Sequence, residues 1–467
     1  MALRRTIPRA LAALLLLAAP AAWGATVRVA PGDLARALGA AAPGDTLVLL
    51  PGTHPGPVAV TVPVTLEAEP GAVLDGGGTG VVVEVKAPGT TLRGLDVRHS
   101  GTSLYDQHAG IFLGKEAAGS LVEGNRLSGN LIGIYVWGAA DVMVRGNLVL
   151  GRNDLRVSER GNGIQLWNAP GTKVVGNTVR GGRDGVFVTT SHHNLFADNV
   201  FEGVRFAVHY MYTNDSEVSG NRSVGNHVGY ALMYSHRLKV RGNLSKGDRQ
   251  HGLLLNYANA SEVEGNVVEG RFDGTGPGEA GDAGDKDMPP EDGDPTAPRT
   301  GTGKCVFIYN ANKNAIRGNR FEGCEVGVHF TAGSERNAIS GNAFVANRTQ
   351  VKYVGTRSLD WSAGGVGNFW SDNAAFDLDG DGIADEAYRP NDVVDRVVWA
   401  HPQAKLLLNG PGVQVLRWAQ KQFPAIHPGG VTDTAPLMSA AGVPTAATLA
   451  TPLAGGRPLA AIGAPHG

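Results

Sequence analysis

The sequence of 467 residues has few cysteines, few charged residues and few aromatic residues. Cys305 and Cys324 are its only cysteines, so no network of disulfides holds the fold together. The two can pair in an oxidising compartment or remain ordinary buried thiols. Charged residues make up 18% and the formal net charge is −2, which argues against a nucleic-acid partner. With 42% hydrophobic residues, the chain can still form a large core, which excludes disorder throughout.

Long hydrophobic runs are also scarce, and the one candidate lies at the N-terminus. Residues 1–25 combine a basic start (Arg4, Arg5 and Arg9), a short apolar run over Leu11–Ala19 and small residues around Ala22–Ala25. The apolar run is well short of the roughly 20 residues that span a bilayer. We therefore predict a cleaved secretory signal rather than a membrane anchor, and an exported mature protein.

Glycine is abundant, with 67 residues, and its arrangement is periodic. A Gly-Asn dipeptide, or Asp-Asn in one case, recurs with a period of about 22 residues. Its asparagines are Asn125, Asn147, Asn177, Asn199, Asn221, Asn243, Asn266, Asn319 and Asn342. In phase with it, a small residue precedes alternating apolar residues, as in Gly133-Ile134-Tyr135-Val136. Short strands joined by turn residues at this period predict an all-β fold, a right-handed parallel β-helix whose stacked asparagines form amide ladders.

The chain then divides into segments. Residues 26–98 contain a short helix over Asp33–Ala42, which we expect to cap the first coil, followed by the first coils. Residues 99–375 form the main β-helix, interrupted by an acidic insertion over 271–303. Residues 376–410 carry an Asp-rich loop. Residues 411–467 are predicted to be a largely irregular tail, with a short helix over Val415–Phe423.

The repeat also predicts which side chains point outward, because alternate residues of a strand face opposite sides. One expected outer column holds Tyr135, Gln165, Phe187, His209, Ala231, Leu254, Phe307 and His329. Its neighbour holds Trp137, Trp167, Met211, Met233, Asn256 and Tyr309. An exposed aromatic face of this kind is typical of a binding surface. The partner-binding residues predicted from it are Tyr135, Trp137, Trp167, Phe187, Tyr309 and His329. Alternatively, a tail or loop buries this face.

Met211 and Met233 are 22 residues apart, so the repeat stacks them on adjacent coils. Coils lie about 4.8 Å apart, which lets two thioethers approach one soft ion. His209 precedes Met211 by two residues on the same face, and His236 lies in a histidine-rich region with His192. Thioether and imidazole suit Cu(I), so we predict a transient copper site at Met211, Met233, His209 and His236. The alternative is that both methionines pack against aromatics such as Tyr212 and Tyr234.

A second candidate metal site lies near the C-terminus. Asp377, Asp379, Asp381 and Asp385 alternate with glycine in a pattern typical of Ca²⁺ loops. The twelfth position is Tyr388 instead of glutamate, so the loop is not a complete EF-hand. It is either a calcium site that fastens the C-terminal end or a simple acidic turn.

Several stretches resemble the NosD family of periplasmic copper-binding accessory proteins of nitrous-oxide reductase. They are Arg205–Tyr212, Gly229–Ser235, Gly367–Asn373 and Asp377–Pro390. The resemblance implies a carbohydrate-binding/sugar-hydrolase type β-helix in the periplasm. It also implies work with an ABC transporter, made of a membrane subunit and its ATPase, to help copper reach the reductase. A membrane-anchored copper chaperone is a further expected partner.

Three functions follow from these features. The first is a non-enzymatic copper carrier and docking platform. The second is a polysaccharide lyase, hydrolase or epimerase, although neither outer column contains the paired carboxylates that glycosidases need. The third is an adaptor that binds a protein and no metal. We expect the first.

Overall fold

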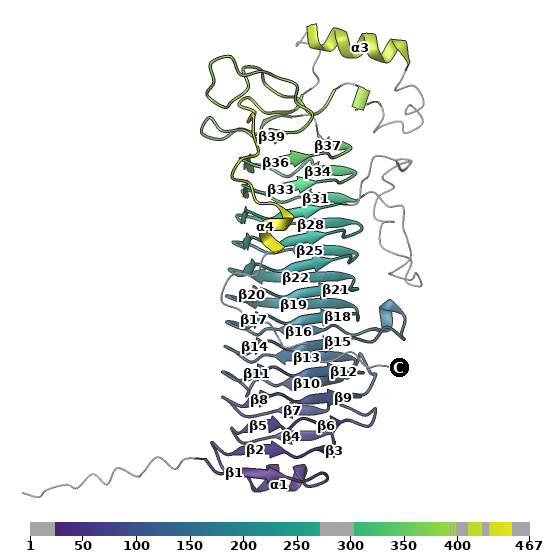
Figure 1. The fold of residues 1–467 in the computed structure, drawn as a ribbon, viewed down its shortest axis with the longest axis vertical. Helices are drawn as coiled ribbons and strands as arrows, with labels where there is room; N and C mark the ends of the chain where they lie inside the picture. Colours follow the sequence, from purple (N-terminus) through teal and green to yellow (C-terminus); the bar gives the residue numbers. More distant parts are fainter. Residues whose placement is uncertain are drawn as a thin grey trace, which may run out of the picture.

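The computed structural model describes residues 24–270, 303–355, 357–392, 394–395, 397, 410–422 and 429–450. Three parallel sheets of 13, 12 and 13 strands wind around one apolar core (Figure 1), and each strand pairs with its equivalent in the next coil. The predicted parallel β-helix is confirmed. The predicted signal at 1–25 and the insertion at 271–303 fall almost wholly outside the described residues.

Each coil contributes one strand to each sheet. The first sheet consists of β1 (Thr26–Val29), β2 (Thr46–Leu49), β5 (Thr65–Ala68), β8 (Thr91–Arg93), β11 (Leu121–Glu123), β14 (Met143–Arg145), β17 (Lys173–Val175), β20 (Leu195–Ala197), β23 (Glu217–Ser219), β26 (Lys239–Arg241), β29 (Glu262–Glu264), β32 (Ala315–Arg317) and β35 (Ala338–Ser340). The second sheet consists of β4 (Val58–Val60), β7 (Val83–Val85), β10 (Ala109–Leu113), β13 (Ile132–Trp137), β16 (Ile164–Trp167), β19 (Asp184–His192), β22 (Phe206–Asn214), β25 (Val228–Met233), β28 (His251–Asn256), β31 (Lys304–Tyr309), β34 (Val326–Thr331) and β37 (Thr349–Val354). The third sheet consists of β3 (Gly52–Pro55), β6 (Ala72–Asp75), β9 (Asp96–Arg98), β12 (Arg126–Ser128), β15 (Leu148–Leu150), β18 (Thr178–Arg180), β21 (Val200–Glu202), β24 (Arg222–Val224), β27 (Leu244–Lys246), β30 (Val267–Glu269), β33 (Arg320–Glu322), β36 (Ala343–Val345) and β39 (Phe369–Trp370).

The asparagines of the Gly-Asn repeat form a continuous buried ladder between the first and third sheets. Each side chain donates from Nδ2 to Oδ1 of the asparagine one coil further on, for example Asn199 to Asn221 at 2.9 Å and Asn221 to Asn243 at 3.0 Å. The glycines of this repeat have a positive φ, such as 64° at Gly220, which glycine adopts without strain, and Asp198 takes the same position before Asn199 with a φ of 56°. This dipeptide therefore repeats because it turns the chain and supplies the amide at the same time.

The small residues near the start of the strands of the second sheet have a different role. A Cβ atom added at Gly133 would lie 2.4 Å from the carbonyl oxygen of Gly163, and one at Gly229 would lie 2.4 Å from that of Gly252. The backbone of the next coil thus occupies the space of a side chain. These glycines are needed for close approach between coils.

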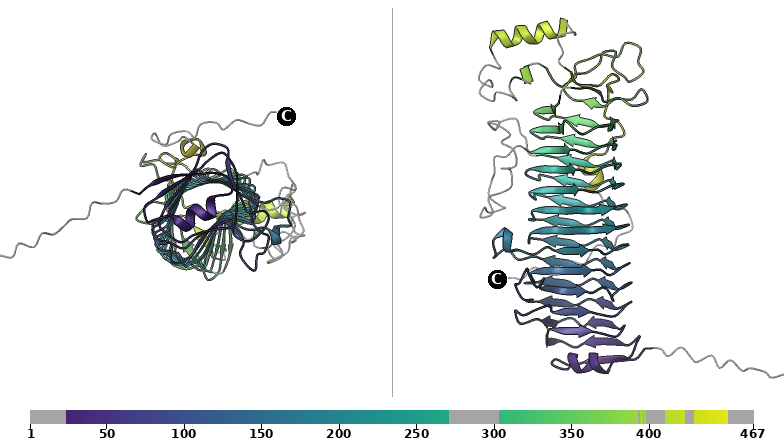
Figure 2. Two further views of the ribbon diagram at one scale, coloured as in Figure 1. Left: turned by 90° about the horizontal axis from the view of Figure 1, so that it is seen from below. Right: turned by 180° about the vertical axis from the view of Figure 1, so that it is seen from behind.

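The N-terminal end is closed as predicted. Helix α1 (Leu34–Ala40) buries Leu34 and Leu38 and lies across the opening of the first coil (Figure 2, left). It covers apolar side chains that a further coil would otherwise bury.

The C-terminal end is closed by a segment far along the chain. β40 (Gly430–Thr432) pairs with β38 (Ser358–Asp360), and the chain then runs back alongside the coils to α4 (Ala446–Ala450), which lies against β27 and β30 (Figure 1). Residues 433–445 lie outside any helix or strand, yet backbone pairing of β40 and the burial of Val431 and Asp433 hold this part of the predicted tail in place. The predicted short helix is present as α3 (Pro411–Gln422).

Asp433 ends the asparagine ladder. Its Oδ2 accepts hydrogen bonds from the backbone N (2.6 Å) and Nδ2 (3.1 Å) of Asn368, the last ladder residue, and from Nε1 of Trp370 at 2.8 Å. Burial raises the pKa of Asp433, while the hydrogen bonds from Trp370 and Asn368 oppose that rise. An acceptor at this point satisfies the donors that a further coil would have paired.

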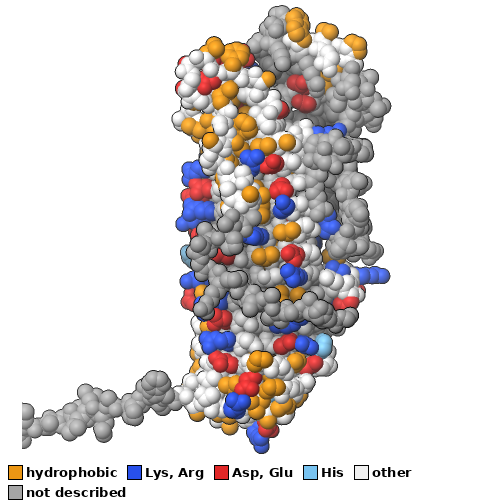
Figure 3. Space-filling view, viewed as in Figure 1, with side chains coloured by type: hydrophobic (Ala, Val, Ile, Leu, Met, Phe, Trp, Pro, Cys, Tyr) orange, Lys and Arg blue, Asp and Glu red, His pale blue; other side chains and the backbone are white. Residues whose placement is uncertain are grey.

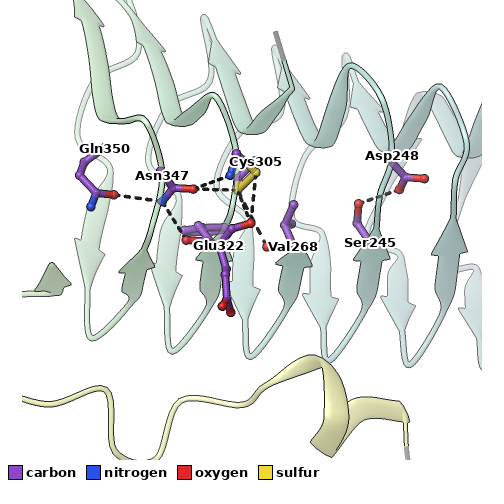
Figure 4. Close-up of a disulfide and its surroundings, with 9 residues drawn as sticks. Ser245, Asp248, Val268, Cys305, Glu322, Asn347 and Gln350 are labelled. Atoms are coloured by element: carbon purple, nitrogen blue, oxygen red, sulfur yellow. Dashed lines mark hydrogen bonds between the residues drawn. A yellow bond between two sulfur atoms is a disulfide. The ribbon is translucent and has the colours of Figure 1, made fainter. Parts of the chain in front are cut away.

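The two cysteines are joined by a disulfide. Cys305 on β31 is bonded to Cys324, which follows β33 in the same coil, and Asn347 lies beside the pair (Figure 4). The backbone N of Cys324 donates to Asn347 Oδ1 at 2.9 Å. Of the two states that the sequence leaves open, the structure shows the paired one.

The outer faces of the first and third sheets carry pairs of opposite charges. Arg93 lies between Glu67 and Glu123, and Arg145 also pairs with Glu123. Basic and acidic side chains lie next to one another on the face shown in Figure 3. In the described part of the chain, no helix is both long enough and apolar enough to cross a bilayer.

Candidate metal centre

The outer side of the second sheet carries the predicted columns in the predicted register. Tyr135 is opposite Gln165, Phe187 is opposite His209, and His209 is opposite Ala231. In the neighbouring column Met211 is opposite Met233, with both side chains half-buried. The two thioethers therefore belong to adjacent rungs, about 4.8 Å apart along the β-helix axis.

The first outer column is mostly buried, which corrects part of the predicted partner-binding set. Tyr135 is 2% exposed and His329 is 4% exposed, while Phe187 is half-buried. Tyr135 packs in a small outer cluster with Ala109 and Ile132, separate from the core. Tyr135 and His329 therefore cannot offer a contact surface as they stand.

The physical reason is that the residue before the small residue of each of these strands also packs on the outer side of the sheet. A second outer cluster contains Phe206 and Val228, the first residues of β22 and β25, together with Ala231 and Leu254. Met233 packs against this cluster. Met233 thus packs on a mixed cluster that includes the aromatic Phe206, and the predicted packing of the methionines against Tyr212 and Tyr234 stays a prediction.

The second outer column remains accessible. Trp137 and Trp167 are each 37% exposed and stack with ring centroids 5.3 Å apart, and Tyr309 is 41% exposed. These three members of the predicted partner-binding set therefore do present aromatic surface.

A further aromatic column was not predicted. Tyr212, Tyr234 and Tyr257 follow the second outer column by one residue and stack with centroid separations of 5.3 and 5.1 Å. All three have a positive φ, between 48° and 55°, where bulky residues are rare. Three successive coils thus hold a tyrosine where glycine or asparagine is less strained, and the result is an exposed strip beside Met211 and Met233. The repeat spacing of the tyrosines was the available signal.

His209 is held by a buried carboxylate. Its Nδ1 lies 2.9 Å from Asp184 Oδ2, and its ring lies between Phe187 and Phe206, with centroids at 5.0 and 4.8 Å. Arg205 binds both oxygens of Asp184 at 2.8 Å and covers the Phe206 ring. Burial alone would raise the pKa of Asp184, but the charge of Arg205 and the hydrogen bonds from His209 and Arg205 hold it well below its usual range.

His236 is not brought to this group. The chain turns sharply at Tyr234 and Ser235 points inward, so His236 lies around the corner of the coil with its backbone N bonded to Asn214 Oδ1. His192 lies two coils away in the same column as His236, and its Nδ1 is 2.7 Å from that of His193. His209, Met211 and Met233 therefore occupy neighbouring register positions on the second sheet, and His236 does not; copper binding by them stays a prediction.

The Asp-rich loop collects three of its four predicted ligands. Carboxylate oxygens of Asp377, Asp379 and Asp381 lie within 4.8 Å of one another, whereas Asp385 Oδ2 accepts a hydrogen bond from the backbone N of Leu378. Hydrogen bonds from the backbone of Gly382 and Gly380 lower the pKa of Asp377. The loop is tied to the returning C-terminal segment, because Met438 donates its backbone N–H to the carbonyl of Gly382.

Calcium binding at this loop stays a prediction with a direct thermal test. We expect millimolar Ca²⁺ to raise the melting temperature, since an ion that binds only the folded state stabilises it by mass action. The triple variant Asp377→Asn/Asp379→Asn/Asp381→Asn should not respond. An equal shift in both proteins, measured by differential scanning calorimetry, would place the ion elsewhere.

Comparison with known proteins identifies the class of protein to which this chain belongs. A family model described as "Periplasmic copper-binding protein (NosD)" matches residues 151–375, which include the whole Asp184–Met233 region. The "Probable ABC transporter binding protein NosD" of Pseudomonas aeruginosa is 42% identical over 376 residues, covering 80% of this chain and 84% of that protein. Its counterpart from Stutzerimonas stutzeri is 40% identical, covering 80% and 83%. The chain belongs to the NosD family, and the protein is periplasmic.

Solved structures with a similar backbone are much more distant. The A-module of the mannuronan C-5 epimerase AlgE6 of Azotobacter vinelandii is 14% identical, with a TM-score of 0.46, 69% of this chain and 89% of that chain covered. DFA-IIIase from Arthrobacter chlorophenolicus A6, without its lid, is 16% identical, with a TM-score of 0.46 and coverage of 68% and 89%. These likenesses say nothing of the activity of this chain. Its relatives are named as transporter binding proteins and not as enzymes.

Proposed function

We propose that this protein carries Cu(I) transiently at Met211, Met233 and His209 and passes it on during assembly of the copper centre of nitrous-oxide reductase. The observation that carries the proposal is the register of β22 and β25, which places two thioethers on adjacent rungs beside an imidazole. Soft thioether ligands and imidazole select Cu(I), and thioethers exchange more readily than a closed set of thiolates. The copper is cargo, so weak and reversible binding suits the task.

The partners follow from family membership. The relatives' names support an ABC transporter as the docking partner, here a membrane subunit with its ATPase. The exposed aromatic strip of Trp137, Trp167 and Tyr309, together with the tyrosine column, supplies a contact surface beside the copper ligands. Aromatic residues are enriched at protein interfaces, and this position brings a client or a membrane-anchored copper chaperone close to the ion.

The enzymatic alternative has less support. Glycosidases need two carboxylates that flank the scissile bond. From Tyr135 to His329 the two outer columns contain no Asp or Glu, and the buried carboxylate next to them, Asp184, is already bound by Arg205 and His209. Measurable turnover of a uronate polymer would favour the enzyme over the carrier.

The proposal is tested by loading the purified protein with Cu(I) under anaerobic conditions. We expect one ion per chain, with sulfur and nitrogen neighbours in its X-ray absorption spectrum and with transfer to copper-free reductase when the two proteins are mixed. Absence of Cu(I) binding, with partner binding intact, would favour the adaptor without metal.

A further inference from the structure

We infer that Asp184 and Arg205 are positioning residues that fix His209 in the tautomer able to bind copper. The inference rests on the proposed function and adds two residues to it that touch no metal. Asp184 begins β19, one coil before His209 on β22, and its side chain lies among the outer residues of the second sheet. Both partners of the carboxylate are buried with it.

The tautomer follows from the hydrogen-bond inventory. Arg205 donates to both oxygens of Asp184 in a bidentate pair, which is the geometry of a carboxylate. A carboxylate only accepts hydrogen bonds, so Nδ1 of His209 must carry the proton at their 2.9 Å contact. The lone pair of the neutral ring is then on Nε2. No hydrogen-bond partner of Nε2 is found in the described residues.

The ring cannot easily turn over to reverse this arrangement. Phe187 and Phe206 contact it from two sides, and Arg205 lies 4.4 Å above the centre of the Phe206 ring. The same arginine therefore neutralises Asp184 and supports one wall of the imidazole. Metal-binding histidines generally bond their second nitrogen to a carboxylate or carbonyl in this way, which orients the ring and raises its basicity.

The neighbour of His209 in the next coil is small and fully buried. Ala231 is its direct neighbour in β25, and its methyl group is the smallest side chain that the first outer column has in this region. Met211 follows His209 by two residues on the same strand face, and Met233 is one rung above Met211. His209 and the two methionines thus occupy neighbouring positions on the outer face of β22 and β25.

The test removes the positioning pair without leaving a buried charge. We expect Asp184→Asn/Arg205→Gln to weaken Cu(I) binding about 10–100-fold, the usual effect of losing an outer-shell partner. Its X-ray absorption spectrum should lose the nitrogen neighbour and keep sulfur, as should that of His209→Gln. A purely structural role would lower thermal stability and leave the spectrum of the loaded protein unchanged.

A second measurement leaves Asp184 and Arg205 unchanged. In wild-type protein labelled with ¹⁵N-histidine, His209 should give the Nδ1–H pattern, assigned by comparison with His209→Gln. An Nε2–H pattern would overturn the inference, as would a double variant with wild-type affinity and spectrum. The proposed function fails separately, if exchanging Met211 and Met233 for leucine leaves Cu(I) binding unchanged.

Discussion

The double variant Met211→Leu/Met233→Leu should lose Cu(I) affinity by at least about 100-fold, more than the loss of an outer-shell partner costs. Leucine keeps the volume and apolar character of methionine, so the packing of Met233 on Phe206, Val228, Ala231 and Leu254 should persist. What disappears is the pair of thioether ligands. Competition with a chromogenic Cu(I) chelator under anaerobic conditions measures the change.

The chain contains its own control for that experiment. Met143 is half-buried and lies on β14 in the first sheet, whereas the second outer column belongs to the second sheet. Met143→Leu should bind copper like the wild type. The single variants Met211→Leu and Met233→Leu should each fall between the wild type and the double variant. Equal affinity of the double variant and the wild type would remove the proposed copper site.

The second large effect concerns stability. Asn221→Ala should lower the free energy of unfolding by about 3–5 kcal/mol, because it deletes a side chain bonded on both sides. The Nδ2 of Asn221 donates to Asn243 Oδ1 at 3.0 Å and to the carbonyl of Phe196 at 2.8 Å, and its Oδ1 accepts from the backbone N of Asn199 at 3.0 Å. Alanine leaves buried groups on both neighbouring coils without partners.

Urea unfolding followed by circular dichroism measures this loss. Val224→Ala, an exposed substitution in the same coil, should change stability by no more than about 0.5 kcal/mol. If Asn221→Ala unfolds at the wild-type midpoint, the ladder contributes far less than its buried hydrogen bonds imply.

The sequence predicted the parts of the fold that depend on periodicity. The spacing of Asn199, Asn221 and Asn243 was enough to place Met211 opposite Met233, because every coil between them has the same length. The capping helix was also predictable from Leu34 and Leu38. In each case a local pattern determines the outcome.

Other features depend on contacts that no local pattern encodes. Tyr135 and His329 were expected on the surface, yet both are buried, Tyr135 against Ala109 and Ile132 and His329 beside Phe307. Asp184 precedes His209 by 25 residues, so its role appears only once a coil is closed and the strand starts are known to face outward. Asp433 meets Asn368 from 65 residues away, and its neighbours lack any repeat.

The position of Asp433 has a consequence for how the polypeptide is completed. Before residue 433 has been synthesised and has docked, the amide donors of Asn368 have no partner in Asp433 and the sheet edge of the last coil is open, like the end of a growing filament. A shortened product that stops before β40 would offer that end to the first coil of another copy, restrained only by α1. We therefore expect proteins clipped in this stretch to associate end to end, because they lack the C-terminal segment that pairs with β38 and accepts from Asn368.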